Sequence, residues 1–228
     1  MSTLTDLDKR PVRSYILRQG RLTKYQESGI KKFAPKYTIP FQKMPLNFDQ
    51  VFHKKNKIIL EIGFGMGDTT FKMAQEMPDS NFLAVEVHSP GVGSLLNKIN
   101  LSQLENLKII QHDAIEVMNE MIPNKSLDGI HIFFPDPWPK KKHHKRRLLK
   151  NSFLKLMEIK LSQLGYIHIA TDWEAYALEI ITLVGESKSY KMSKRDLNKK
   201  PQSRPLTKYE NRGLRLGHQV WDIVITLR

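Results

Sequence analysis

Residues 57–67 read K-I-I-L-E-I-G-F-G-M-G, a short apolar run that ends in three closely spaced glycines. Four later segments repeat such a run: NFLAVEVH, LKIIQHD, LDGIHIFFPDP and GYIHIATD. Apolar runs of this length predict strands that are buried on both faces, as in a parallel sheet. The glycines permit a tight turn from the first strand into a helix. The stretch therefore predicts the first strand of an α/β sheet.

Helical patterns lie between these runs and complete the alternation of an α/β domain. The alternation predicts a mostly parallel sheet with helices on both faces, and a last strand in HQVWDIVITLR. A basic, proline-containing loop is expected over residues 187–215. The predicted helices span residues 68–76, 91–104, 114–121, 145–164 and 173–185.

Residues 1–50 differ from the rest of the chain, because the segments RSYILRQGR and KKFAPKY are basic and Pro35, Pro40 and Pro45 interrupt this region. This composition predicts an N-terminal arm that orders on binding or packs onto the core. Residues 51–228 are then the main domain.

The whole chain is basic and lacks cysteine. Its 37 lysines and arginines against 23 acidic residues give a formal net charge of +14, which favours a polyanionic partner such as nucleic acid. The lack of cysteine excludes disulfides and thiolate metal sites and is consistent with a reducing cytosol. No apolar run has the length of a membrane span, and the first residues do not resemble a signal peptide. We expect a cytoplasmic protein with no membrane segment.

Each of five predicted strand ends carries an acidic residue. In a parallel sheet these ends meet at one edge, where ligands bind. A single acid there can instead cap the next helix, and for Asp113 alone the two interpretations are equally good. The acids are Glu61, Glu86, Asp113, Asp136 and Asp172.

The glycine turn departs from the fingerprint of dinucleotide-binding proteins. Gly63, Gly65 and Gly67 are followed by Asp68, at the position of the third glycine of G-x-G-x-x-G. Negative charge at Asp68 and Glu61 would repel a pyrophosphate and suits a cation. S-adenosylmethionine, with a sulfonium, an ammonium and no phosphate, therefore fits the turn better than a dinucleotide.

Later strand ends extend this candidate cofactor site. Glu86 follows Gly63 by 23 residues, near the usual spacing for an acid that accepts the ribose hydroxyl hydrogens. Asp113 and Ala114 suit the adenine edge.

The stretch FFPDPWPKKKHHKRR, residues 133–147, places one carboxylate beside a basic run. Pro135 and Pro137 fix the backbone on both sides of Asp136, so its carboxylate is held in place. Trp138 could stack on a base, although a tryptophan after a strand is more often a core or lid residue. Residues 140–147 suit phosphates. The stretch thus predicts a base-reading acid next to a patch that holds a nucleic-acid backbone.

Seven stretches together, RSYILRQGRLTKYQ, EIGFGMG, VEVHSPGVG, FFPDPWPKKKHHKRR, ATDWEAYA, SRPLTKYENRG and GHQVWD, resemble the bacterial tRNA (guanine-N7-)-methyltransferase family. The resemblance covers nearly the whole chain. It implies a Rossmann-like class I S-adenosylmethionine-dependent methyltransferase fold with a seven-stranded, mostly parallel sheet. It also implies S-adenosylmethionine as methyl donor and guanosine 46 of the tRNA variable loop as acceptor.

The resemblance also implies cofactor contacts at Glu61, Glu86, Asp113 and Asp136, together with the substrate and RNA contacts. The residues themselves add Gly63, Gly65, Gly67 and Ala114 to the expected cofactor contacts, and the charge of Asp136 makes it the expected catalytic residue. The expected substrate contacts are Lys140, Asp172, Thr207, Lys208, Tyr209 and Glu210. The expected RNA contacts are Lys142, His143, His144, Lys145, Arg146 and Arg147. The family more often has phenylalanine at Tyr209 and arginine at Lys142, so Lys142 lacks the bidentate fork for phosphate.

Methylation at guanine N7 suits these residues, because N7 has a free lone pair and carries no hydrogen. The reaction needs alignment and no general base. Asp136, Asp172 and Glu210 can accept hydrogen bonds from guanine N1 and N2 and stabilise the ring as it becomes cationic. A base in a loop or single strand is what such a pocket can reach.

Three alternative functions are weighed against this one. Exocyclic-amine methyltransferases have an Asp/Asn-Pro-Pro-aromatic motif similar to PDPWP, but Trp138 interrupts the proline pair. A non-catalytic RNA-binding protein on the same fold would lose the acids, which are all present. A metal enzyme is least favoured, because His143 and His144 are adjacent and lie among cations. Of the other histidines, His112 and His131 are expected to be core residues. For His218 a core role and a functional role are both open.

Overall fold

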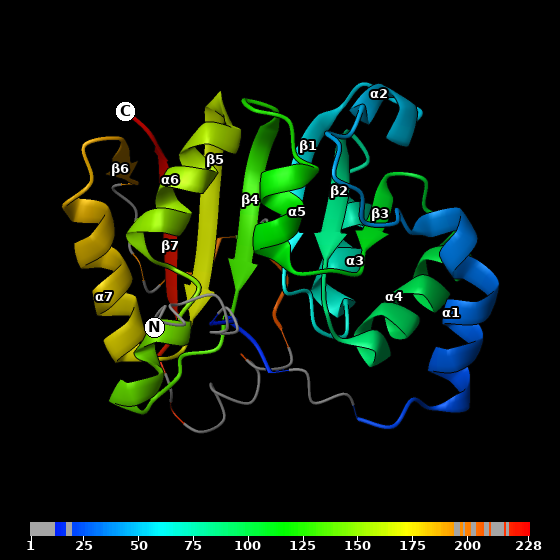
Figure 1. Ribbon diagram of the computed structural model, residues 1–228, viewed down its shortest axis with the longest axis horizontal. Helices are drawn as coiled ribbons and strands as arrows, with labels where there is room; N and C mark the ends of the chain where they lie inside the picture. The colour runs from blue at the N-terminus through cyan, green and yellow to red at the C-terminus, as the bar shows by residue number, and fades with distance from the viewer. Residues whose placement is uncertain are drawn as a thin grey trace, which may run out of the picture.

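The computed structural model describes residues 12–16, 20–193, 197, 199–201, 204–207, 210, 217 and 219–228. Within them lies a seven-stranded sheet with the order β3-β2-β1-β4-β5-β7-β6 (Figure 1). The strands are β1 (Lys57–Ile62), β2 (Ser80–Val85), β3 (Leu107–Ile110), β4 (Leu127–Phe133), β5 (Leu161–Thr171), β6 (Tyr190–Met192) and β7 (Trp221–Leu227).

Strands β1 to β5 are parallel, and β7 pairs antiparallel with both β5 and β6. The buried runs of β1 and β2 explain the parallel arrangement, because such strands need cover on both faces. The prediction of a mostly parallel seven-stranded sheet is confirmed. The carboxyl ends of the five parallel strands point to one edge, the lower edge in Figure 1.

Two hydrophobic cores lie on opposite faces of this sheet, and alternate residues of β1 serve each of them. Ile59 packs with Tyr37, Met73 and Leu95 of α1, α3 and α4, while Leu60 belongs to the core of α5, α6 and α7. Helices therefore cover both faces, as predicted. They are α1 (Lys24–Tyr37), α2 (Phe48–Val51), α3 (Asp68–Glu76), α4 (Ser89–Ser102), α5 (Ala114–Glu120), α6 (Asn151–Lys160) and α7 (Glu174–Gly185).

The prediction of one helix over residues 145–164 was wrong at both ends, because α6 spans only Asn151–Lys160. A short 3₁₀ helix, η1 (Lys141–Arg146), ends before Arg147, whose backbone is extended at φ −54° and ψ 135°. Its buried side chain reaches back to the carbonyl of Pro137, so the chain turns before α6 begins. At the other end, Leu161 already belongs to β5. The apolar pattern of α6 runs directly into that of the strand.

Part of the region assigned to the N-terminal arm forms a helix on the sheet. Thr23 is the N-cap of helix α1, its hydroxyl and Gln26 form a capping box, and the helix packs against α4. The contact is close, because a Cβ at Gly29 would stand 2.5 Å from Asn97 Nδ2. Residues 24–37 thereby cover one face of the sheet. The division into an arm and a domain stays a prediction.

Helix α4 also approaches the glycine turn after β1. A Cβ added at Gly91 would stand 1.9 Å from the carbonyl oxygen of Gly65, so only glycine fits there. This contact fixes the turn against the helix and shapes the edge where ligands bind. No helix in the described part of the chain is long and apolar enough to cross a membrane.

Candidate active site

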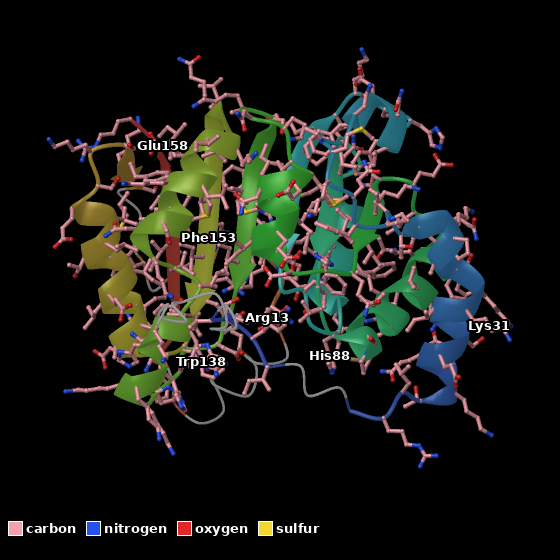
Figure 2. The ribbon with its side chains drawn as sticks, viewed as in Figure 1. Arg13, Lys31, His88, Trp138, Phe153 and Glu158 are labelled. Atoms are coloured by element: carbon pink, nitrogen blue, oxygen red, sulfur yellow. The ribbon has the colours of Figure 1, made fainter. Side chains whose placement is uncertain are left out.

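A pocket of about 800 Å³ lies at the carboxyl ends of β1, β2, β4 and β5, and part of the N-terminal segment completes its wall. Figure 2 labels His88 and Trp138 at this edge of the molecule. The pocket is lined by Ser14, Tyr15, Ile16, residues 61–69, residues 85–88, His112, Ala114, residues 132–137, Leu148, Asp172 and Thr207.

Glu61, the last acid before the glycine turn, is the most deeply buried carboxylate of the pocket. Its side chain is 3% exposed, and its Oε2 atom has no hydrogen-bond partner within the described residues. Burial, with a smaller effect from the negative charge of Glu86, raises the pKa of Glu61 to about 7. A cationic group in the pocket would supply the missing partner and favour the ionised carboxylate.

Glu86, at the end of β2, holds the glycine turn in place. One carboxylate oxygen accepts from the backbone N–H of Gly65 at 2.8 Å, and the other accepts from Val87 and His88 at 2.7 and 3.1 Å. The carboxylate is therefore fixed at the pocket wall, and its contact with a ribose stays a prediction.

Asp113 takes the capping role that the sequence left open. Its carboxylate accepts from the backbone N–H of Ile115 at 2.8 Å, as the N-cap of α5. It does not line the pocket, whereas its neighbour Ala114 does. Burial and then the nearby Asp113 carboxylate raise the pKa of the pocket-lining Tyr15.

Asp136 and Asp172 present two carboxylates to the pocket. No hydrogen bond or ion pair joins either side chain to another described residue. The loop around Asp136 is held from both sides, because Phe134 N–H donates to Ala170 at 2.7 Å and Arg147 Nε donates to the Pro137 carbonyl at 2.8 Å. Partial burial raises the pKa of Asp136 above its ordinary value.

The charges of the pocket suit a cation and disfavour a phosphate. Its lining contains five acids, Glu61, Asp68, Glu86, Asp136 and Asp172, and neither lysine nor arginine among the described residues. A pyrophosphate would lack a counter-charge here. The unpaired Oε2 atom of Glu61 fits an ammonium or sulfonium, so the donor set suits S-adenosylmethionine. No cluster of three potential metal ligands occurs within the described ranges.

The basic run lies beside this pocket on η1. Lys140, Lys142 and Lys145 are exposed, and Arg146 and His143 pack on Trp138 at centroid distances of 5.1 and 5.8 Å. Trp138 in turn donates from Nε1 to the carbonyl of Ser14 at 3.2 Å. The patch and the pocket wall are therefore joined through Trp138.

Arg147 stands apart from the other basic residues. Its side chain is 3% exposed, pairs with Glu179 and lies 4.7 Å from the ring centroid of Tyr176. The guanidinium anchors the loop of Asp136 to α7. Because it is buried and already paired, it is poorly placed to contact a phosphate. His144 is partly exposed on η1 with the other patch residues.

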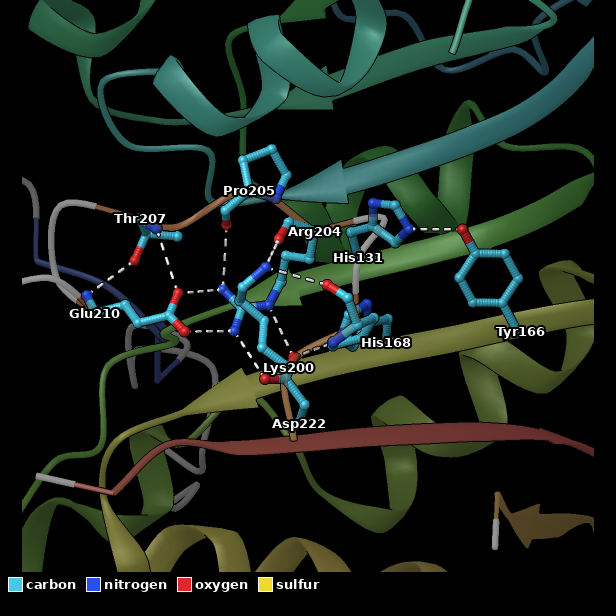
Figure 3. A network of polar contacts seen from close by, with 10 residues as sticks. His131, Tyr166, His168, Lys200, Arg204, Pro205, Thr207, Glu210 and Asp222 are labelled. Atoms are coloured by element: carbon cyan, nitrogen blue, oxygen red, sulfur yellow. Dashed lines mark hydrogen bonds and ion pairs between the residues drawn. The ribbon is translucent and has the colours of Figure 1, made fainter. Parts of the chain in front are cut away.

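The expected substrate segment is only partly described. Thr207 lines the pocket, whereas Glu210 is 3% exposed and gives both carboxylate oxygens to Arg204 at 2.6 and 3.0 Å (Figure 3). Lys208 and Tyr209 lie outside the described residues. Sequence reasoning missed Arg204, although T-x-x-E is a recognisable capping-box pattern for Thr207 and Glu210.

The histidines divide into core and pocket residues. His131 is 1% exposed and hydrogen-bonds the Tyr166 hydroxyl at 2.8 Å, as expected of a core residue. The same expectation was wrong for His112, which lines the pocket, pairs with Glu116 and stacks on Phe41 at 3.8 Å. His218 lies outside the described residues.

The sheet order and the acidic pocket beside a glycine turn define a class I S-adenosylmethionine-dependent methyltransferase. Two solved structures share this fold at 12% identity. An rRNA methylase from Streptococcus thermophilus aligns with a TM-score of 0.50 over 78% of this chain and 90% of its own. The 16S rRNA methyltransferase KamB aligns with a TM-score of 0.55 over 79% of this chain and 91% of its own. A family model described as "Putative methyltransferase" matches residues 55–223.

Curated relatives narrow the class to one family. The chain is 50% identical over 220 residues to the tRNA (guanine-N(7)-)-methyltransferase of Methylobacillus flagellatus, covering 96% of this chain and 92% of the relative. It is 47% identical to the enzyme of that name from Nitrosospira multiformis, covering 94% of each. The chain belongs to the tRNA (guanine-N(7)-)-methyltransferase family.

Because Glu61 is buried, we expect Glu61→Gln to stabilise the folded protein and to weaken cofactor binding. Because the folded pKa is raised, ionisation costs stability as pH rises through the ordinary carboxyl range to about 7. Without cofactor, Glu61→Gln should raise the unfolding free energy at pH 8 by on the order of 3 kcal/mol and leave it unchanged near pH 4. Urea titrations at the two pH values measure this.

In calorimetry, the same variant should bind S-adenosylmethionine more weakly than the wild type at pH 8. The wild-type affinity should rise between about pH 6 and 8, because Glu61 must be ionised to pair with the cation. The variant should lose that rise. A wild-type affinity that does not change with pH would remove Glu61 as the partner of the cation.

Proposed function

We propose that the protein transfers the methyl group of S-adenosylmethionine to N7 of a guanine in tRNA, guanosine 46 of the variable loop. The observation that carries the proposal is the pair Asp136 and Asp172, two pocket carboxylates without a partner among the described residues. Guanine offers N1–H and N2–H₂ donors on the edge away from N7, and such carboxylates can accept from them. The strongly basic chain supplies the complementary charge for the tRNA backbone.

The two acids would act by position and charge. Guanine N7 has a lone pair and no hydrogen, so neither Asp136 nor Asp172 needs to remove a proton from it. Their negative charges stabilise the ring as methylation makes it cationic. S-adenosylmethionine supplies an activated methyl group, and Glu61, Glu86 and the glycine turn would hold that cofactor.

The proposed roles of the basic residues depend on how exposed their side chains are. Lys142, Lys145 and Arg146 would hold tRNA phosphates near the mouth of the pocket, with His143 and His144 on the same 3₁₀ helix. Lys140, the N-cap of that helix, would contact the substrate. Arg147 would contribute indirectly, through the loop of Asp136. The cytoplasmic location stays a prediction.

The proposal is tested by incubating unmodified tRNA with the protein and isotopically labelled S-adenosylmethionine, followed by mass analysis of the nucleosides. We expect labelled 7-methylguanosine, and sequencing of the cleaved product should place it in the variable loop. Label on an exocyclic amine would instead favour the amine-methylating alternative. A tRNA with another base at that position is the matched control.

Asp136→Asn keeps the shape of the side chain and removes its charge. We expect kcat to fall about 100-fold or more, as when electrostatic stabilisation of a transition state is lost. The fold should persist, because the raised pKa of Asp136 means that its ionisation does not stabilise the folded state. Single-turnover rates of the wild type at saturating substrates should stay nearly flat between about pH 6 and 8. A tenfold rise per pH unit would show that a proton is being removed and would overturn the N7 assignment.

The patch on η1 should contribute to tRNA affinity through phosphates. Replacing Lys142 and Lys145 together by glutamine should reduce the slope of log affinity against log salt by about 1.5 and leave cofactor affinity unchanged. The matched control replaces Lys125 and Lys188, exposed lysines near the last residue of the chain, by glutamine. Filter binding over a salt series measures the slopes. Equal slopes for the two double variants would remove the patch from the RNA surface.

A further inference from the structure

A buried arginine ties the segment of Thr207 to the sheet (Figure 3). Arg204 is 0% exposed, and its guanidinium holds two carboxylates with paired hydrogen bonds. Nε and Nη2 donate to Asp222 at 2.8 and 2.7 Å, and Nη1 and Nη2 donate to Glu210 at 2.6 and 3.0 Å. Nη1 also donates to the Pro205 carbonyl at 3.4 Å. All the donors of the fork are engaged.

The sheet side of this contact is rigid. Asp222 lies on β7, and its Oδ1 atom is 2.6 Å from Nε2 of His168 on β5. Burial opposes ionisation of Asp222, yet the bonds from His168 and Arg204 hold the pKa of its carboxyl below the ordinary value. The guanidinium also lies 5.6 and 5.7 Å from the ring centroids of Phe133 and Phe134, which line the pocket. Arg204 is thus fixed to strand residues beside the pocket.

The pocket side of the contact is the capping box of Thr207 and Glu210. Thr207 N–H donates to Glu210 Oε2 at 3.3 Å, and Glu210 N–H donates to the Thr207 hydroxyl at 3.0 Å. Glu210 does not line the pocket and has both oxygens engaged, whereas Thr207 does line it. Within the described residues the Thr207 hydroxyl hydrogen has no acceptor, so it is free to donate to a ligand.

We propose that Arg204 is a positioning residue for the base, which acts by holding Thr207 at the pocket wall. The Thr207 hydroxyl then donates to O6 of the guanine, an acceptor that adenine lacks. Glu210 acts through Arg204 and does not contact the base. This inference rests on the proposed methylation of guanine.

Arg204→Lys tests the positioning role, because lysine keeps the charge and loses the planar fork. Hydrogen exchange of residues 204–207 should become faster while exchange in β1 stays unchanged. The value of kcat/KM for tRNA should fall about tenfold, and the dissociation constant of S-adenosylmethionine should stay within about twofold of wild type. Arg228→Lys, at an exposed arginine whose Nε donates to the Tyr190 carbonyl, is the matched control and should match wild type in each measurement.

A double-variant cycle separates positioning from simple stabilisation. In the background of Thr207→Val, which removes the hydroxyl, Arg204→Lys should cause little further loss in kcat/KM. Thr207→Ser should restore the sensitivity to Arg204→Lys. Equal losses from Arg204→Lys in the wild-type and Thr207→Val backgrounds would show that Arg204 does not act through this hydroxyl.

Glu210→Gln provides a second test if Arg204→Lys folds poorly. It should speed exchange at residues 204–207 and lower kcat/KM for tRNA together. A loss of activity with unchanged exchange would place Glu210 on the base and overturn the inference. Absence of 7-methylguanosine from the wild-type reaction would reject the proposed function. Unchanged exchange in Arg204→Lys would reject the anchoring role whatever the reaction is.

Discussion

The hydrogen bonds of Glu86 are the contact on which the pocket depends. One carboxylate at the end of β2 accepts from Gly65 in the turn after β1 and from Val87 and His88 in its own loop. It therefore joins two βα units whose strands are neighbours in the sheet. With the turn fixed in this way and Gly91 packed beneath it, Glu61 is left buried beside an open cavity. The proposed cation site at Glu61 would then be a consequence of how the turn is held.

Negative charges line the pocket, whereas the chain as a whole is strongly positive. The pocket contains acids without a lysine or arginine in its described lining, while the chain as a whole has a net charge of +14. In the proposed reaction, the basic exterior would attract the tRNA backbone, and the acidic pocket would stabilise a cationic cofactor and a guanine that becomes cationic. Trp138 contacts both regions, because it donates to the Ser14 carbonyl of the pocket wall and packs against Arg146 of the basic run. Asp136 lies at this boundary, which explains why one short stretch combines an acid and a basic run.

Sequence patterns with local causes were the ones that could be predicted. The buried strands follow from their apolar runs, and the helix at residues 68–76 was predicted with its observed bounds because a glycine turn precedes it. Asp113 was placed correctly at a strand end, and its capping role was one of two interpretations considered. The end of η1 could not be predicted, because it depends on Arg147 reaching Glu179, which is 32 positions away in the chain. The Arg204 contacts with Asp222 likewise cross from a loop to another strand.

Two buried arginines, Arg147 and Arg204, each tie a segment beside the pocket to a helix or a strand. Arg147 holds the Pro137 carbonyl and Glu179 of α7, and Arg204 holds Glu210 and Asp222 of β7. Both would support the base side of the proposed site, whereas Glu61 on β1 and Glu86 just after β2 would support its cofactor side. Arginine suits this task, because its fork can fix a loop carbonyl or a carboxylate in direction as well as in distance. An enzyme that removes no proton relies on the alignment of its two substrates. Rigid anchoring of the pocket loops by these arginines would therefore contribute directly to the rate, because it would keep the substrates aligned.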